Sequence, residues 1–211
     1  MVKDLFGYVG SDNDVTLEKV KQINGLKVEF DFISSFEEKD LLYSIDKNEW
    51  LTDLKRRVQH FGYKYDYRAR RIDKTSYIGK IPEWMIFLYK RLQERNLIAF
   101  DPDQAIVNEY TKGQGIAAHI DCEPCFGNTI ISVSLGSQCV MDFQRDIESK
   151  EADKLSLLIK PRTLIVMTGE SRYLWYHGIS ARNTDKFNGC IHERRRRVSI
   201  TFRKVILDKN R

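Results

Sequence analysis

The stretch Asn108–Asp121 reads N-E-Y-T-K-G-Q-G-I-A-A-H-I-D. Asn108 and Tyr110 precede a glycine-containing turn, and His119 and Asp121 follow it. Side chains two residues apart on a β-strand project from the same face, so each pair points into one cavity. An imidazole and a carboxylate are two ligands of the 2-His-1-carboxylate triad that binds Fe(II) in non-haem oxygenases. Because a lone His-x-Asp pair also arises by chance, this prediction requires a third ligand.

A third ligand and two arginines follow further along the chain. His177 lies in M-T-G-E-S-R-Y-L-W-Y-H-G-I, a segment expected to return as a strand beside the first. The later segment R-V-S-I-T-F-R carries Arg197 and Arg203 on one face if it is extended, and three apolar residues on the other face. This alternation predicts a strand that buries one face in the core.

Taken together, these motifs resemble the AlkB-like Fe(II)- and 2-oxoglutarate-dependent dioxygenases over residues 30 to 206, in the family's order and spacing. Three segments are most similar to the oxygenase domain that hydroxylates a modified wobble uridine in tRNA. They are R-R-V-Q-H-F-G-Y-K-Y at 56 to 65, G-Q-G-I-A-A-H-I-D, and S-L-G-S-Q-C-V-M-D-F. The resemblance implies an enzyme that uses Fe(II), 2-oxoglutarate as cosubstrate, and O2.

The resemblance also implies a role for each motif residue. The metal ligands are His119, Asp121 and His177, and the cosubstrate residues are Asn108, Tyr110, Arg197 and Arg203. Arg197 is expected at the distal carboxylate with Tyr110, and Arg203 at the metal-proximal carboxylate with Asn108. Six residues of strand span roughly 20 Å, more than the length of the dicarboxylate. The two side chains must therefore lean inward on a twisted strand.

The order of elements predicts an α+β chain. Helices are expected at 36 to 46, with Ser35 and Glu38 in capping-box spacing, and at 82 to 95, with Pro82 in the first turn. Strands are expected at 26–33, 105–110, 129–135, 138–144, 155–160 and 163–168. The resemblance makes the core a double-stranded β-helix, or jelly roll, with flanking N-terminal helices. Residues 1–25 are expected to form an N-terminal extension, and 26–211 a single dioxygenase domain.

Two segments are candidates for nucleic-acid binding. Residues 53 to 78 are dense in aromatic and basic side chains, which can stack on an unpaired base and neutralise phosphates, and their alternation favours a hairpin or loops. Residues 182 to 197 interrupt the strand pattern as a basic loop. In both segments a solvated surface is the open alternative. The candidate residues are Arg57, Tyr65, Tyr67, Arg68, Arg70, Arg71, Arg194, Arg195 and Arg196.

Composition bounds the partners and the compartment. The formal net charge of +5 suits a polyanionic partner. The family resemblance implies that this partner is RNA, and tRNA in particular. There is no long apolar run and no signal-peptide core, so a soluble, intracellular protein without a membrane segment is expected. The four cysteines are expected to be ordinary thiols in a reducing compartment, and the single C-x-x-C at Cys122 and Cys125 disfavours structural zinc.

Three function classes follow from these motifs. The resemblance favours hydroxylation of a modified wobble uridine in tRNA, with oxidative demethylation of N-alkylated bases in RNA or DNA as the alternative. A protein hydroxylase would use the same iron centre. The complete set of ligands and arginines argues against a non-catalytic RNA-binding module. Relatives commonly carry RNA-recognition and methyltransferase domains, so here substrate binding is expected from the barrel's own basic surface or from a separate protein, such as a methyltransferase.

Overall fold

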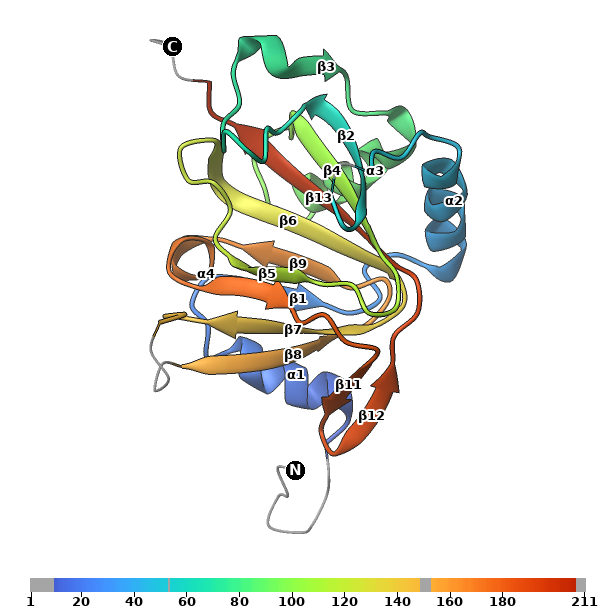
Figure 1. The fold of residues 1–211 in the computed structure, drawn as a ribbon, viewed down its shortest axis with the longest axis vertical. Helices are drawn as coiled ribbons and strands as arrows, with labels where there is room; N and C mark the ends of the chain where they lie inside the picture. The colour runs from blue at the N-terminus through green and yellow to red at the C-terminus, as the bar shows by residue number, and fades with distance from the viewer. Residues whose placement is uncertain (1–9, 53, 149–152, 208–211) are drawn as a thin grey trace.

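A computed structural model describes residues 10–52, 54–148 and 153–207, and its strands form two facing antiparallel sheets (Figure 1). The large sheet has the order β1-β9-β6-β13-β4-β2-β3, and the small sheet has the order β5-β10-β7-β8. Together they form the double-stranded β-helix, as predicted. The large sheet consists of β1 (Leu26–Glu29), β2 (Arg57–Tyr63), β3 (Tyr77–Gly79), β4 (Gln104–Tyr110), β6 (Phe126–Gly136), β9 (Leu164–Met167) and β13 (Arg197–Val205). The small sheet consists of β5 (Ile116–His119), β7 (Cys139–Gln144), β8 (Lys154–Ile159) and β10 (Tyr176–Ile179).

Strand β13 lies between β6 and β4 and shows why the two faces of the large sheet differ. Val198, Ile200 and Phe202 are fully buried in the apolar cluster on the outer face. Arg197 and Arg203 point to the inner face, where they line a cavity between the two sheets. The alternation predicted from R-V-S-I-T-F-R is confirmed.

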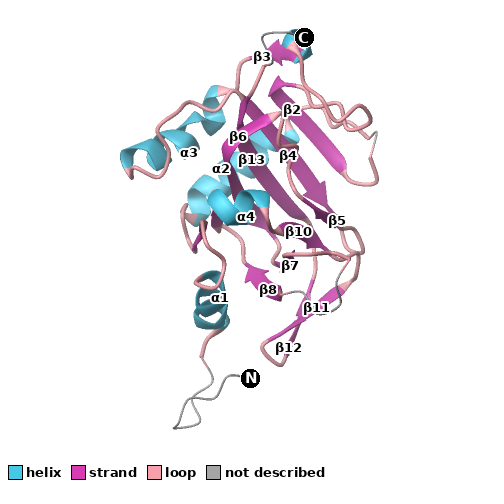
Figure 2. Cartoon of the chain, turned by 90° about the vertical axis from the view of Figure 1, so that its left-hand side faces the viewer, coloured by secondary structure: helices cyan, strands magenta, loops and turns pink. Residues whose placement is uncertain are grey.

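Helices α2 (Ser35–Asp46) and α3 (Glu83–Glu94) cover the outer face of the large sheet (Figure 2). The capping box of α2 is one residue earlier than predicted, because Ser34 Oγ accepts from the Glu37 amide at 3.2 Å and Glu37 accepts from the Ser34 amide at 2.8 Å. Glu38 is instead bound at 3.2 Å to Arg162, in the turn between β8 and β9. Pro82 is the N-cap of α3 and not its first helical residue. None of the described helices is long and apolar enough to cross a bilayer.

The described part of the N-terminal segment packs against the barrel. Helix α1 (Asp12–Val20) lies along β8, where Lys19 Nζ donates to the Ser156 carbonyl at 3.0 Å. Val20 and Ile23 are buried in the same apolar cluster as residues of β6, β7 and β8. Residues 10–25, expected as an extension, therefore contribute to the core, and residues 1–9 lie outside the described ranges.

The basic segment at 182 to 197 is more ordered than the sequence predicted. It contains a hairpin of β11 (Thr184–Phe187) and β12 (Cys190–Glu193), where a loop was expected. Arg194 follows the hairpin and is 4% exposed. Its guanidinium is bound by both carboxylate oxygens of Asp185 at 2.6 and 2.7 Å, and by the Ser180 carbonyl at 2.6 Å. The guanidinium of Arg194 is therefore buried and bound to acceptors within the protein.

Candidate metal centre and cosubstrate cavity

The three expected metal ligands lie together at the edge of the cavity. His119 is the last residue of β5, and His177 is its cross-strand partner on β10. Asp121 follows β5, and its Oδ2 lies 3.7 Å from His177 Nε2. One donor atom from each of the three side chains falls within 4.8 Å of the others. The close approach of the two strands depends on Gly178, because a Cβ there would lie 2.8 Å from the Ala118 nitrogen.

The protonation of these side chains suits a divalent cation. His119 Nδ1 lies 2.9 Å from the Ala117 carbonyl, which orients the ring and leaves Nε2 available to a metal. Burial and the neighbouring His119 lower the pKa of His177 to about 3, so this imidazole is neutral. Burial opposes ionisation of Asp121, but the Arg203 guanidinium holds the pKa of that carboxyl well below its ordinary value. Imidazole nitrogens and a carboxylate are the donor set of the Fe(II) facial triad, and the neutral His177 and the ionised Asp121 are already in the deprotonated form that metal binding requires.

Arg203 lies beside the metal carboxylate. Its Nε and Nη2 donate to Asp121 Oδ1 at 2.9 and 2.6 Å, and its Nη1 donates to Gln104 at 3.3 Å. Asn108 lies opposite Ser199 in the register of β4 and β13, and it lines the same cavity as Arg203. That both residues contact the metal-proximal carboxylate of the cosubstrate stays a prediction. This arrangement resolves the length problem of the R-x5-R segment, since Arg203 reaches the Asp121 side of the metal site.

Arg197 presents a free donor to the inner part of the cavity. It pairs with Tyr110 across β4 and β13, and its guanidinium carbon lies 5.4 Å from the Tyr110 ring. Its Nε donates to Ser134 Oγ at 3.0 Å, whereas its Nη2 is buried and has no partner among the described residues. A buried cation with an unsatisfied N–H fits a carboxylate ligand, because a guanidinium matches that group bidentately. The site thus fits 2-oxoglutarate as well as Fe(II).

One cavity of about 1010 Å³ is lined by the three candidate metal ligands, the predicted cosubstrate residues and part of the 53–78 segment. Tyr65, Tyr67 and Arg70 line it, whereas Arg68 and Arg71 are exposed outside it. Segment 53–78 contains the β2–β3 hairpin, as predicted. Tyr65 stacks edge-on against Tyr67 at 5.0 Å and contacts Phe126 at 5.6 Å, so the aromatic wall is continuous with the floor of the site.

The remaining basic candidates are not brought to the cavity. Arg57 donates to both oxygens of Glu109 at 2.8 and 2.9 Å. Arg196 donates to Glu109 at 2.6 Å and to Asp46, so Glu109 connects both arginines on the outer side of the sheet. Arg195 is exposed.

Sequence reasoning missed two arginines near the site. Arg56, adjacent to the predicted Arg57, lines the cavity and donates from Nε to Asn108 Oδ1 at 2.8 Å. Arg172, in α4 (Gly169–Tyr173), is 2% exposed and donates to the Asp121 carbonyl at 2.9 Å and the Gly127 carbonyl at 3.3 Å. Arg56 belongs to the same basic and aromatic segment as the predicted candidates and could have been named with them, whereas the residue pattern around Arg172 did not indicate its role.

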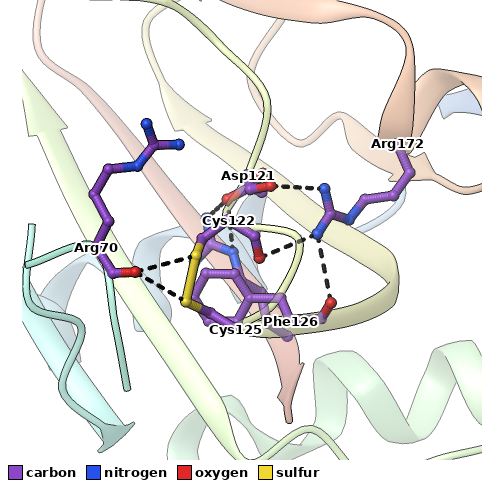
Figure 3. Close-up of a disulfide and its surroundings, with 7 residues drawn as sticks. Arg70, Asp121, Cys122, Cys125, Phe126 and Arg172 are labelled. Atoms are coloured by element: carbon purple, nitrogen blue, oxygen red, sulfur yellow. Dashed lines mark hydrogen bonds and ion pairs between the residues drawn. A yellow bond between two sulfur atoms is a disulfide. The ribbon is translucent and has the colours of Figure 1, made fainter.

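Cys122 and Cys125 are joined by a disulfide directly after Asp121 (Figure 3). The prediction that all four cysteines are thiols is wrong for this pair, because the turn after β5 brings their Cα atoms to 5.3 Å. Both sulfurs lie 3.4 Å from the Arg70 carbonyl, which places the 65–70 segment against this turn. Cys139 and Cys190 are free thiols.

Comparisons with known proteins agree with this geometry. The sequence profile of the 2OG-Fe(II) oxygenase superfamily matches residues 44–203. A protein of Acanthamoeba polyphaga mimivirus, named uncharacterized protein L905, is 36% identical over 193 residues, which cover 92% of this chain and 90% of the viral protein. The Mus musculus protein named tRNA (carboxymethyluridine(34)-5-O)-methyltransferase ALKBH8 is 40% identical over 205 residues, which cover 86% of this chain and 30% of the mouse protein.

A solved structure, OsALKBH1, has the same fold at a TM-score of 0.65 and 18% identity, covering 85% of this chain and 96% of that one. The chain spans less than a third of the length of the mouse relative. The profile match covers the metal ligands and both arginines of β13. This chain belongs to the 2OG-Fe(II) oxygenase superfamily and is an AlkB-like dioxygenase within it.

Proposed function

We propose that this dioxygenase acts on RNA and hydroxylates a modified wobble uridine in tRNA. The observation that carries the proposal is the single cavity that joins the metal ligands to Tyr65, Tyr67 and Arg70. Aromatic rings beside a cation are the surface on which an unpaired base stacks while its phosphate is neutralised. The mouse relative, whose name specifies carboxymethyluridine at position 34 of tRNA, supports the same substrate class.

The chain's own residues bind and orient the reactants. When bound, Fe(II), 2-oxoglutarate and O2 supply an oxidation that converts the cosubstrate to succinate and CO2 and inserts one oxygen atom into a substrate C–H bond. His119, Asp121 and His177 would hold the metal, because one donor atom from each lies within 4.8 Å of the others. Arg197 binds the distal carboxylate with Tyr110, and Arg203 fixes the Asp121 carboxylate toward the metal. These residues contribute orientation and electrostatics.

The position of the reacting carbon decides between the two nucleic-acid chemistries. Hydroxylation of a carbon-linked substituent gives a stable alcohol, as proposed here. Hydroxylation of an N-methyl group gives an unstable hemiaminal that loses formaldehyde, which would make the enzyme a demethylase. A methyltransferase on a separate protein could prepare the substituent before hydroxylation.

The test incubates the purified protein with Fe(II), 2-oxoglutarate and bulk tRNA in air, then digests the RNA and compares nucleoside masses. The matched control is His119→Ala, which removes one metal ligand at the end of β5. The expected result is a gain of one oxygen atom on a modified uridine with the wild type alone. Loss of methyl groups would identify a demethylase instead. Succinate formation without any change in the nucleosides, together with turnover of a peptide, would identify a protein hydroxylase.

A further inference from the structure

Two neighbouring arginines differ in their surroundings: Arg57 begins β2, and Arg56 lies in the bend directly before it. Arg57 pairs with Glu109 in the register of β2 and β4, and its guanidinium is bound by that carboxylate on the outer face. Arg56 lines the cavity, whereas Arg57 is not among the cavity-lining residues. The main chain at this point is fixed, since Gln114 Nε2 donates to the Lys55 carbonyl at 2.7 Å.

Arg56 lies between the cosubstrate residues and the aromatic wall. Its Nε donates to Asn108 Oδ1 at 2.8 Å, and its guanidinium carbon lies 5.9 Å from the rings of both Tyr67 and Tyr110. No carboxylate of the described residues forms an ion pair with it, unlike Arg57. The guanidinium is half-buried on the Tyr67 side of the cavity.

The charges of the cavity leave Arg56 uncompensated. Arg203 is neutralised by Asp121 at 2.6 Å, and Arg197 is assigned to the distal carboxylate of the cosubstrate. The second carboxylate among the described lining residues, Asp142, accepts from the hydroxyls of Ser156 at 2.5 Å and Ser180 at 3.3 Å. The basic side chains that line the cavity are Lys55, Arg56, Arg70, Lys154, Arg197 and Arg203. A base that carries a fixed positive charge would therefore meet an excess of like charge in a partly desolvated site.

We propose that Arg56 is a specificity-determining residue that binds a carboxyl-derived oxygen acceptor on the substituent of the substrate base. A carboxylate and its ester both offer such an oxygen, and a guanidinium donates to either, more strongly to the carboxylate. The same cation disfavours N-alkylated bases that are positively charged. This inference rests on the proposed function, because it names the chemical class of base that the RNA oxygenase accepts.

The test uses four anticodon stem-loop RNAs of one sequence that differ at a single position. This position carries 5-carboxymethyluridine, its methyl ester, unmodified uridine, or cationic 1-methyladenosine. Turnover is measured as oxidised or demethylated nucleoside. Binding is measured by fluorescence anisotropy without O2 and with Mn(II) in place of Fe(II), so that the readout does not depend on activity. The proteins are the wild type, Arg56→Gln, Arg56→Lys and the matched control Arg57→Gln on the outer face.

Arg56→Gln is expected to lose about 10- to 100-fold in affinity and kcat/KM for the two carboxyl-bearing RNAs, as for a lost hydrogen bond to a charged or strongly polar group. Arg56→Lys recovers part of the carboxylate affinity and little of the ester affinity, because it keeps the charge without the fork. The KM for 2-oxoglutarate and the binding of the unmodified RNA should change less than about twofold, and Arg57→Gln should behave as the wild type.

Three results would overturn the role of Arg56. An equal loss on all four RNAs, with a reduced salt dependence, would make it a phosphate contact. A raised KM for 2-oxoglutarate would make it a cosubstrate residue, and unchanged discrimination would make it a spectator. Failure of the wild type to turn over or bind any of the RNAs would overturn the proposed function and this inference together, a result distinct from a failure confined to Arg56→Gln.

Discussion

The two faces of the large sheet use the same side chain in different ways. On the outer face, Arg57 and Arg196 both donate to Glu109, which is 3% exposed, so their charges are satisfied within the protein. On the inner face, Arg197 retains a buried nitrogen without a described partner, and Arg56 has no described carboxylate beside it. The comparison teaches that the role of an arginine depends on whether the folded protein supplies a carboxylate partner for it. Its position in a basic run of the sequence does not distinguish a structural role from a binding role.

The largest effect is expected from removing the inner arginine that is neutralised. Arg203→Met takes the guanidinium away from Asp121, whose carboxylate is buried with it. Breaking a buried ion pair from one side costs about 3–5 kcal/mol, so the metal-free protein should lose stability on that scale. Metal affinity should fall about 10- to 100-fold, because a supporting contact to a ligand is lost. Urea unfolding and Co(II) titration measure the two effects.

Added metal should reduce the stability cost of Arg203→Met, because the cation replaces the lost positive charge beside Asp121. Arg203→Lys serves as the control that keeps the charge without the two-nitrogen fork. Equal stability losses with and without Co(II) would show that Arg203 acts through packing, and an unchanged KM for 2-oxoglutarate would remove it from the cosubstrate site.

A smaller effect on metal affinity is expected from substitution of Arg172, which is hydrogen-bonded to the main chain of the turn that carries Asp121. Its guanidinium donates to the carbonyls of Asp121, Cys122 and Phe126 (Figure 3). No acidic side chain of the described residues forms a hydrogen bond with it, and Nε donates to the Gly127 carbonyl. Arg172→Met should weaken Co(II) binding about tenfold by loosening the Asp121 backbone. Arg172→Lys should recover part of the affinity. A Co(II) absorption spectrum identical to that of the wild type would show that Arg172 stabilises the fold without positioning the ligand.

The sequence predicted those parts of the fold in which the residue pattern is compatible with only one secondary structure and one orientation of the side chains. Alternation in R-V-S-I-T-F-R placed Arg197 and Arg203 inside and Val198 outside, and the strand spacing indicated a β core. The start of α2 was predicted one residue late, because S-S-F-E-E allows two capping registers, and the contacts of Glu37 with Arg91 and of Glu38 with Arg162 select one.

The site was predictable where the chemistry requires particular residue types at a fixed spacing. His119, Asp121 and His177 lie together as the motifs indicated. The roles of the basic residues were less predictable, because the sequence does not show which carboxylate lies beside each arginine in the folded protein. Asp185 buries Arg194 from nine residues away across a hairpin. The proximity of Cys122 and Cys125 likewise depends on a turn conformation that the spacing alone does not specify.

On the outer face, the informative substitution removes the carboxylate and not an arginine. Glu109→Gln should leave both Arg57 and Arg196 without their shared anion, although each is partly exposed and can recover hydration. A loss of about 1–2 kcal/mol in the free energy of unfolding is expected for such half-solvated pairs. The KM for 2-oxoglutarate and the affinity for Co(II) should stay within about twofold of the wild type. A larger change in the KM or in the Co(II) affinity would show that the outer arginines are energetically coupled to the cavity.

The smallest effect is expected in the pH dependence of the free energy of unfolding, and it comes from an ion pair between the two helices that cover the outer face. The Arg91 guanidinium, 2.5 Å from Glu37, lowers the pKa of that carboxyl from 4.5 to about 2. The folded protein therefore binds this proton more weakly than the unfolded chain does. The stabilisation is complete above about pH 5 and is lost as the pH falls toward 2. Because both side chains are about a quarter exposed, solvent screening reduces the contribution to about 1 kcal/mol.

The variant Glu37→Gln tests this contribution, because glutamine can still complete the capping box but carries no charge. The difference in urea unfolding energy between the wild type and Glu37→Gln should therefore be about 1 kcal/mol at pH 7 and shrink by pH 3. A difference that stays constant between these pH values would assign the effect of Glu37 to the cap and not to its ion pair with Arg91.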